Sequence, residues 1–434
     1  MENITKELDN LKEEVIESKE MKEKKERNVK VYKLYRIFSF DLLFYYAIIY
    51  LFLATEKGLS AALILQFDAF YILFKSLLQI PSTLLIQKVG KRNSIVMANF
   101  IIVAHMLVII FAPNFSWLLF SQFLCAFGFG IKATCETDLL YDSIPHGEKR
   151  GSTFAKIDGR ATSIHYYIGA ISSVLAGFLF VINSYLPIIF CFLVLLFTAI
   201  LSTQFESIHE KKEKFNIQKE IKNIRYSIKG IFQSKRLLSL LLLNALMIGI
   251  IKITQNLRNT VLLEIGMPEQ YFGVIFAIME IMSGLASRQQ GLIHKIFKNR
   301  TLTFLMYPTV ISLLILGFLL MINLDYQVVV TIVLILFTVQ YMTKGPYYIL
   351  IKRYLNNFTN SEKRVKIATA NNIVENIIAS LLVFVASFVT NILPLNLTLI
   401  ILGCILTLMV VLLLDVMRNT VGLNPEKYSK KEIL

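Results

Sequence analysis

Long runs of apolar residues, separated by short polar segments, dominate the hydrophobic pattern of this chain. A helix needs about 20 apolar residues to cross a bilayer core about 30 Å thick, and the runs have about this length. The pattern therefore predicts an all-α membrane protein with twelve transmembrane helices. The predicted spans are 37–55, 63–86, 94–112, 116–142, 158–182, 185–205, 238–264, 270–292, 302–322, 327–352, 367–391 and 395–417.

Composition supports the membrane assignment. The chain is 55% hydrophobic and 17% charged, with a mean hydropathy of +0.60. A water-soluble core cannot enclose this much apolar surface, so the bilayer is the expected solvent. The start of the chain is rich in Lys and Glu and lacks the apolar segment of a cleavable signal. The cysteines all fall inside predicted spans, where they read as small hydrophobic residues and not as disulfide or metal ligands.

A net charge of +15 could indicate a nucleic-acid-binding protein. The positions of the basic residues along the chain instead indicate how the protein is oriented in a membrane. Lys and Arg gather in the two tails and in alternate loops, whereas the other loops contain Lys57 as their basic residue. Basic residues are retained on the cytoplasmic side of a membrane. We therefore expect a multi-pass protein of the bacterial cell (inner) membrane with both termini cytoplasmic and no nucleic-acid partner.

One long polar interruption follows the sixth predicted span and divides the chain into two halves. The predicted parts are an N-terminal tail 1–36, a six-helix bundle 37–205, a cytoplasmic linker 206–237, a second six-helix bundle 238–417 and a C-terminal tail 418–434.

Isoleucines at 4-3-4 spacing in the linker (Ile217, Ile221, Ile224, Ile228) permit an amphipathic helix on the anionic inner leaflet, and a solvated linker is the alternative. The same spacing in the N-terminal tail permits a short helix or coiled-coil contact, but a mobile charged tail is the favoured expectation.

The two halves share short sequence matches at corresponding loops. The segment Leu85–Lys91, after the second span, is similar to Leu292–Lys298 after the eighth, and Glu148-Lys149-Arg150 recurs as Glu362-Lys363-Arg364. Equivalent loops with the same membrane orientation indicate a parallel repeat of six spans, an arrangement used for alternating access.

The loop after the second span resembles a motif of the major facilitator superfamily. Lys88, Gly90, Lys91 and Arg92 match that motif, while Thr83 and Gln87 replace its first Gly and its Asp. Gly suits a tight turn, and cations near helix ends can reach acids of neighbouring spans. The resemblance implies an inner gate made by Lys88, Gly90, Lys91, Arg92 and Asp142, weakened or rebuilt by the two replacements.

Two further segments refine the resemblance. Leu139–Ser143 with Phe154–Arg160 is similar to the junction between spans four and five in a bacterial branch with drug-exporting members. In the fourth span, however, Gln122 stands where proton-coupled members often carry Arg. The fifth-span antiporter signature is reduced to Gly169, Ser173 and Gly177, whose spacing of four predicts a close packing face. The antiporter assignment loses support accordingly.

Several ionisable residues fall inside predicted spans. A charge in hydrocarbon costs roughly 2.5 kcal/mol or more, so such residues usually face a polar cavity or each other. The candidate cavity or coupling residues are Lys75, Lys132, Glu136, His165, Lys252, Glu280, Lys344 and Glu375. Glu280 has no cation within four residues and is predicted to be a coupling or substrate carboxylate. The residues Asp41, Asp142, Asp158, Arg160 and Arg288 lie near the inner surface and are expected to be structural or to reach the interface.

The leading hypothesis is a secondary active transporter that exports a small amphipathic compound by alternating access, driven by protons. The alternative is uptake of a polar or anionic nutrient, which the lysines at membrane depth favour. A membrane-embedded enzyme is a third hypothesis, but the five His are scattered and no nucleotide-binding loop is present. We therefore expect no enzyme activity, no cofactor and no metal. The expected partners are a small-molecule substrate, protons and the lipid bilayer, and the protein is expected to be a monomer.

Overall fold

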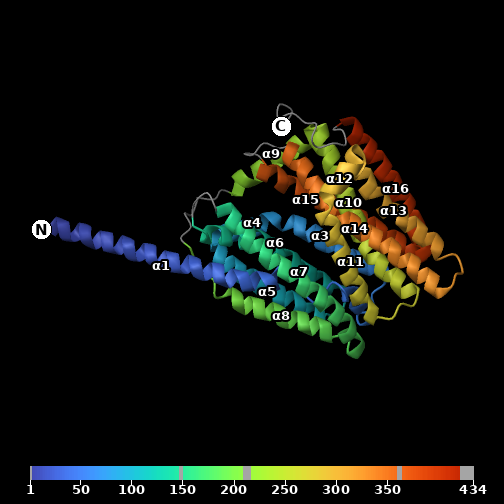
Figure 1. Cartoon of the computed structure of the whole chain (residues 1–434), viewed down its shortest axis with the longest axis horizontal. Helices are drawn as coiled ribbons and strands as arrows, with labels where there is room; N and C mark the ends of the chain where they lie inside the picture. The colour runs from blue at the N-terminus through green and yellow to red at the C-terminus, as the bar shows by residue number, and fades with distance from the viewer. Residues whose placement is uncertain (1, 146–149, 209–216, 359–363, 421–434) are drawn as a thin grey trace.

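The computed structural model describes residues 2–145, 150–208, 217–358 and 364–420, and these ranges fold into helices joined by short turns (Figure 1). The helices are α1 (Glu2–Ser39), α2 (Ile49–Thr55), α3 (Ala61–Leu77), α4 (Gln79–Val89), α5 (Lys91–Phe111), α6 (Phe115–Ser143), α7 (Arg150–Ile182), α8 (Leu186–Ser202), α9 (Ile217–Gln233), α10 (Lys235–Glu264), α11 (Gln270–Arg288), α12 (Gln290–Phe297), α13 (Thr301–Leu319), α14 (Tyr326–Phe358), α15 (Arg364–Ile392) and α16 (Leu395–Thr420), with a short 3₁₀ turn, η1 (Lys298–Arg300), before α13.

The helices confirm a multi-pass membrane protein. Among the described residues, 9 helices are long and apolar enough to cross a membrane, and the number is 10 if the bent pair α3 and α4 is counted as one span. The helix α8 is apolar but has only 17 residues, and the first predicted span is interrupted between α1 and α2. Each predicted span coincides with a helix or with a pair of helices, but the total of twelve stays a prediction.

The N-terminal segment is helical, as the 4-3-4 spacing of its apolar residues permits, and its mobility stays a prediction. It is helical from Glu2 and continues without interruption into the first predicted span as α1 (38 residues), which projects from the bundle in Figure 1. Near the bundle, Arg27 lies 2.9 Å from Glu206. The Asn28 side chain also donates to the Glu206 carbonyl and accepts from its amide, at 3.0 and 2.8 Å. These contacts tie α1 to the end of the first half.

We call the end of the bundle where α1 emerges the tail side, and the opposite end, where α2 joins α3 and α10 joins α11, the far side. Each half contains a second span made of two helices. The axes of α3 and α4 differ by 50°, and Pro81, in the first turn of α4, has no N–H to donate to the Leu77 carbonyl. The pair α11 and α12 repeats this division, and residues with positive φ follow both short helices: Gly90 (φ 89°) and Lys298 (φ 45°). This correspondence agrees with the predicted repeat.

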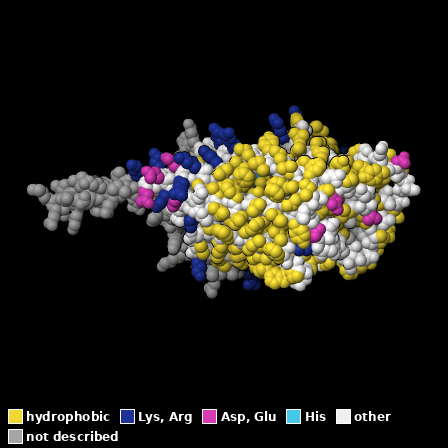
Figure 2. Space-filling view, turned by 90° about the horizontal axis from the view of Figure 1, so that it is seen from below, with side chains coloured by type: hydrophobic (Ala, Val, Ile, Leu, Met, Phe, Trp, Pro, Cys, Tyr) yellow, Lys and Arg dark blue, Asp and Glu magenta, His cyan; other side chains and the backbone are white. Residues whose placement is uncertain are grey.

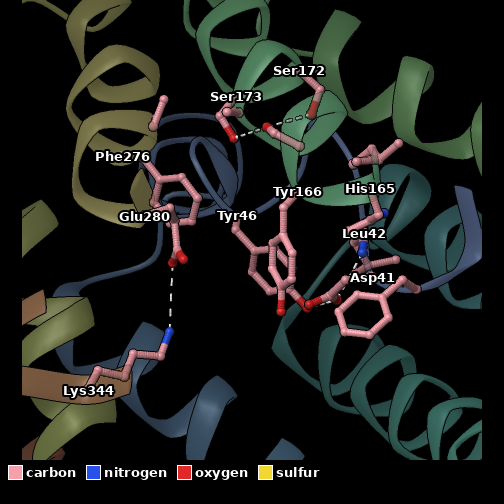
Figure 3. A pocket seen from close by; sticks show the side chains of 15 residues that line it. Asp41, Leu42, Tyr46, His165, Tyr166, Ser172, Ser173, Phe276, Glu280 and Lys344 are labelled. Carbon is pink, nitrogen blue, oxygen red and sulfur yellow. Dashed lines mark hydrogen bonds and ion pairs between the residues drawn. The ribbon is translucent and has the colours of Figure 1, made fainter. Parts of the chain in front are cut away.

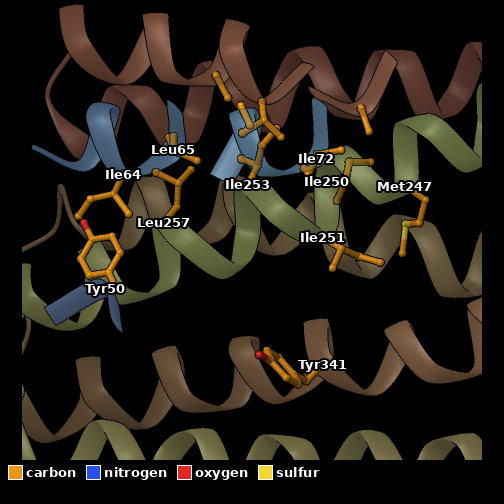
Figure 4. Packing of buried hydrophobic residues seen from close by; sticks show 14 of the residues in the cluster. Tyr50, Ile64, Leu65, Ile72, Met247, Ile250, Ile251, Ile253, Leu257 and Tyr341 are labelled. Carbon is orange, nitrogen blue, oxygen red and sulfur yellow. The ribbon is translucent and has the colours of Figure 1, made fainter. Parts of the chain in front are cut away.

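The two halves meet through two main pairs of helices. The helix α3 packs against α15 and α10, and α7 packs against α11. Figure 4 shows Ile64, Leu65 and Ile72 of α3 beside Ile253 and other apolar residues of α10. One continuous apolar core therefore crosses the boundary between the halves.

The linker contains the amphipathic helix that the isoleucine spacing permits, and this helix is α9. It packs against α10 and α15, with Ile231 buried and Ile228 against the core. Lys222 and Arg225 are exposed. The apolar face of α9 therefore contacts protein, and a contact of its charged face with lipid stays a prediction.

The outer surface has the character expected of a bilayer-facing protein. Figure 2 shows apolar side chains over most of the visible bundle face, with lysines and arginines gathered towards the end where α1 emerges. Large apolar side chains such as Phe111, Ile182 and Phe388 are exposed. Contiguous apolar surface of this extent marks a contact with membrane or with another protein.

Candidate functional site

The first span is broken at membrane depth. The helix α1 ends at Ser39 and α2 begins at Ile49, and Phe44, in the intervening segment, has a φ of 62°. Backbone groups freed by such a break need partners because no water is available in hydrocarbon. The Lys132 ammonium donates to the Ser39 carbonyl at 2.6 Å, and the His165 ring lies 2.8 Å from the Ile37 carbonyl. Side chains of α6 and α7 thus stabilise the open end of α1.

A pocket of about 200 Å³ lies beside this break. Its lining comes from both halves: residues 40–43 and Tyr46 of the broken span and one face of α7 on one side, and α11 and α14 on the other (Figure 3). The polar and aromatic lining residues are Phe40, Asp41, Tyr46, His165, Tyr166, Ser172, Ser173, Phe276, Glu280 and Lys344. The pocket therefore changes shape if one half moves relative to the other.

Two acidic groups enter the pocket from opposite halves. On the first side, Asp41 accepts hydrogen bonds from the Tyr46 hydroxyl at 2.5 Å and from the Leu42 amide at 2.9 Å. On the second side, Glu280 of α11 lies 3.7 Å from the Lys344 ammonium of α14, and both side chains are about one third exposed (Figure 3). No cation lies within four residues of Glu280 on its own helix, and its cationic partner comes from α14. Asp41, expected to be structural, lines the pocket.

Arg258 adds a further cation behind this pair. Its side chain is buried on α10, and its guanidinium lies 4.7 Å from the Tyr341 ring centre and 5.9 Å from that of Phe276. It also contacts the Met279 sulfur at 3.6 Å. Within the described part of the chain no carboxylate pairs with Arg258. Stacking on aromatic faces stabilises the desolvated guanidinium in place of a counter-ion.

Lys132 and Glu136 lie outside the pocket, in a buried ionic cluster on the tail side of the first half. They approach each other to 3.5 Å, as their spacing predicts. Arg36 of α1 binds Glu136 at 2.7 Å and Asp158 of α7 at 3.0 Å. The Tyr35 hydroxyl also donates to Glu136. Two cations and two acids are thus neutralised locally, which indicates that this cluster fastens α1 to α6 and α7.

An ionic contact between α10 and α3 joins the two halves directly. Lys252 of α10 lies 3.9 Å from Asp68 of α3, and the Asn256 side-chain amide donates to the same carboxylate at 2.9 Å. Lys75, two helical turns along α3 from Asp68, is exposed and within electrostatic range of Lys252 and Asp41. Neither lysine is among the residues that line the pocket.

Glu375 lies apart from both the pocket and the ionic cluster around Glu136. It lies on α15 with 2% of its surface exposed, and it accepts a hydrogen bond from Asn371 one turn earlier. No cation of the described residues forms an ion pair with it. The helix thus buries Glu375 away from the pocket that contains Glu280.

The loop between α4 and α5 is held by ionic and backbone contacts within the first half. Gly90 adopts a φ of 89°, a conformation that favours glycine. Lys91 lies 2.5 Å from Asp142 at the end of α6. Arg92 donates to the carbonyls of Thr203 and Phe205 at 2.8 and 2.9 Å. Arg150 also approaches Asp142, at 3.7 Å, while Lys88 is exposed. The loop thus joins the tail-side ends of α4, α6 and α8, and its role as a gate stays a prediction.

On the far side, α7 and α11 approach very closely. A Cβ added to Gly273 would lie 2.0 Å from the Ser173 carbonyl oxygen, and one added to Gly177 would lie 2.5 Å from that of Gln270. Tyr50 of α2 and Thr260 of α10 also share a hydrogen bond of 2.6 Å. The predicted packing role of Ser173 and Gly177 is confirmed, and the two halves are closed together on this side of the pocket.

The family model of the Major Facilitator Superfamily matches residues 35–381, most of the chain. The chain belongs to the Major Facilitator Superfamily. A comparison with curated protein sequences gives no match.

Solved transporters share the fold of this facilitator. It aligns with a structure of the nucleoside transporter NupG at a TM-score of 0.69 and 10% identity, covering 94% of this chain and 100% of the other. It also aligns with a POT family transporter in complex with 5-aminolevulinic acid at a TM-score of 0.64 and 10% identity, covering 91% and 95%. The TM-scores support a common fold, and identities this low carry the comparison no further than the fold.

The sequence named three residues of the facilitator's pocket and missed others. His165, Glu280 and Lys344 line it, whereas Lys75, Lys132, Glu136, Lys252 and Glu375 do not. Asp41 was expected to be structural because the segment from Phe40 to Ile48 has no Gly or Pro to indicate a helix break. No sequence signal was available for pairs such as Glu280 with Lys344, whose helices meet only in the folded bundle.

Proposed function

We propose that this protein is a proton-coupled secondary transporter of a small polar, charged molecule, and that the pocket between the halves is its substrate site. The observation that carries the proposal is the mixed origin of the lining: Asp41 and Tyr166 come from the first half, and Glu280 and Lys344 from the second. A rocking movement of one half against the other would expose such a site alternately to the two sides. The far-side contact of α7 with α11 then represents one closed gate.

The chemistry of the pocket favours a polar substrate. Two carboxylates, a lysine and a histidine line a volume of about 200 Å³ whose other walls include Phe40, Leu42 and Phe276. Charged groups among apolar walls need charged or strongly polar partners. This lining favours the polar or anionic nutrient of the second hypothesis over the amphipathic export substrate. It also gives no support to placement in the branch with drug-exporting members. Accumulation in energised vesicles of defined orientation separates uptake from export.

Glu280 and Lys344 are the proposed coupling pair. Their ion pair is 3.7 Å long and open to the pocket, so both a proton and a charged substrate can compete with it. Protonation of Glu280 removes the negative charge that holds Lys344, and the Lys344 ammonium is then free to donate to a polar group of the substrate. Two charges exposed to a cavity cost less to separate than a buried pair, which suits a step repeated in every cycle.

The test uses purified protein in proteoliposomes. A thermal-stability screen of small polar solutes first identifies a ligand, because a ligand that binds the folded state raises the melting temperature. Glu280→Gln should then lose accumulation driven by a pH gradient while keeping exchange of labelled against unlabelled solute. The matched control is Glu264→Gln, which removes an exposed carboxylate at the far-side end of α10. Gradient-driven accumulation by Glu280→Gln at the wild-type rate from about pH 5.5 to 8 would show that Glu280 is structural.

A further inference from the structure

Lys75 differs from the other lysines at membrane depth because it has no acidic partner. The other three lie near carboxylates: Lys132 is 3.5 Å from Glu136, Lys252 is 3.9 Å from Asp68, and Lys344 is 3.7 Å from Glu280. No carboxylate of the described ranges forms an ion pair with Lys75, and its side chain is exposed.

The surroundings of Lys75 locate this charge at the boundary between the halves. It lies in the last turn of α3, and the next residue, Ser76, donates to the Ile373 carbonyl of α15 at 2.8 Å. The groups whose charges act on the Lys75 ammonium include Lys252 of α10, which repels it, and Asp41 of the broken span, which attracts it. Asp68 and Lys75 lie seven residues apart, on the same face of α3, and Asp68 meets Lys252 of α10 on that face. Lys75 therefore also faces the boundary between the halves.

An uncompensated charge at this depth is costly, and a second cation nearby increases the cost. Asp68 does not relieve it, because Asp68 already binds Lys252 and Asn256. A carboxylate or phosphate placed between Lys75 and Lys252 would be held by charge-assisted hydrogen bonds and would remove the repulsion.

We infer that Lys75, with Lys252 beside it, binds the anionic group of the transported molecule, which is therefore a small organic acid or phosphate ester. This inference rests on the proposed transport function and adds the substrate class to it. The rest of the substrate extends towards Asp41 and the pocket. Lys75 thus acts as a specificity-determining residue contributed by the first half.

The experiment measures thermal unfolding of the purified full-length protein at pH 7 and constant ionic strength. The probes are acetate, succinate and inorganic phosphate, with glycerol and ethanolammonium as neutral and cationic comparisons. At least one anion should raise the melting temperature of the wild type. Its apparent affinity should fall roughly tenfold to a hundredfold in Lys75→Gln. Lys75→Arg, which keeps the charge, should retain the response, and Lys295→Gln, on the exposed tail side of α12, should behave as the wild type.

The unliganded proteins provide a second measurement. If Lys75 is an uncompensated charge, Lys75→Gln without added anion should melt at the same temperature as the wild type or higher. A lower melting temperature would mean that Lys75 has a structural partner and would overturn the inference.

Equal stabilisation of wild type and Lys75→Gln by every anion would indicate general salt effects and would also overturn it. A wild-type protein whose melting temperature rises only with glycerol or ethanolammonium would overturn the inference as well. The proposed function would survive either result if a solute that stabilises the protein accumulates in proteoliposomes and Glu280→Gln abolishes its accumulation.

Discussion

The close contact between α7 and α11 offers a sharp perturbation, Gly273→Ala. A Cβ at Gly273 would lie 2.0 Å from the Ser173 carbonyl oxygen, and real Cβ atoms essentially never approach closer than 3.0 Å. The difference, 3.0 − 2.0 = 1.0 Å, must be absorbed by moving α7 away from α11, since the obstructing atom belongs to the backbone. Overpacking of this kind costs about 1–3 kcal/mol. Because it acts only while the far side is closed, it should favour the far-side-open state by roughly 5- to 150-fold.

The assay follows a cysteine placed in the pocket. Ala277→Cys puts a thiol among the buried lining residues one turn from Gly273, in a background where the exposed Cys404 is replaced by Ser. A membrane-impermeant thiol reagent is applied from the far side of oriented vesicles. Gly273→Ala should raise the rate of labelling within the stated range. Gly177→Ala should do the same, since its Cβ would meet the Gln270 carbonyl at 2.5 Å.

The matched control is Gly284→Ala on the same helix, where an added Cβ has no neighbour within 4 Å. This variant should be labelled at the wild-type rate. Equal labelling of Gly273→Ala and Gly284→Ala, with both proteins folded by thermal unfolding, would refute the view that this contact closes the far side.

Three further predictions concern the tail side. Gly90→Val should slow transport without preventing membrane insertion, because a φ of 89° strains any residue with a Cβ by about 1–3 kcal/mol; normal turnover in liposomes would remove this loop from the gating mechanism. Arg36→Gln should destabilise the protein by about 3–5 kcal/mol, since Glu136 and Asp158 lose their shared cation; a melting temperature equal to that of the exposed control Arg160→Gln would contradict this. A reporter fused after Leu434 should be active only in the cytoplasm, and activity outside would reverse the topology.

Much of the fold was predictable because the bilayer imposes a simple rule. Apolar runs of sufficient length must be helices, so each predicted span coincides with helical structure. The alternation of basic loops predicts the direction in which each helix crosses the membrane. Local geometry was also predictable: Gly90 has the positive φ that its position in a tight turn favours, and Lys132 meets Glu136 one turn away.

The remaining features depend on contacts between distant segments. The break before α2 is stabilised by Lys132 and His165, from α6 and α7, and the segment itself carries no helix-breaking residue. Glu280 looked isolated because its cation, Lys344, is 64 positions away on α14. The attachment of α1 to the end of the first half was not predictable, because the sequence does not show that Arg27 and Asn28 find partners there.

The most direct test of the central claim, that the halves rock about the pocket, is a pair of distances measured by electron spin resonance. Exposed positions Gln87 and Lys295 carry spin labels on the tail side, and Pro113 and Asn323 carry them on the far side. Distances are recorded for the wild type at about pH 5.5 and 8 and for Gly273→Ala. The account predicts two populations that change reciprocally, with the tail-side distance shortening in Gly273→Ala as the far-side distance lengthens. Distances on both sides that stay unchanged in every condition would contradict it.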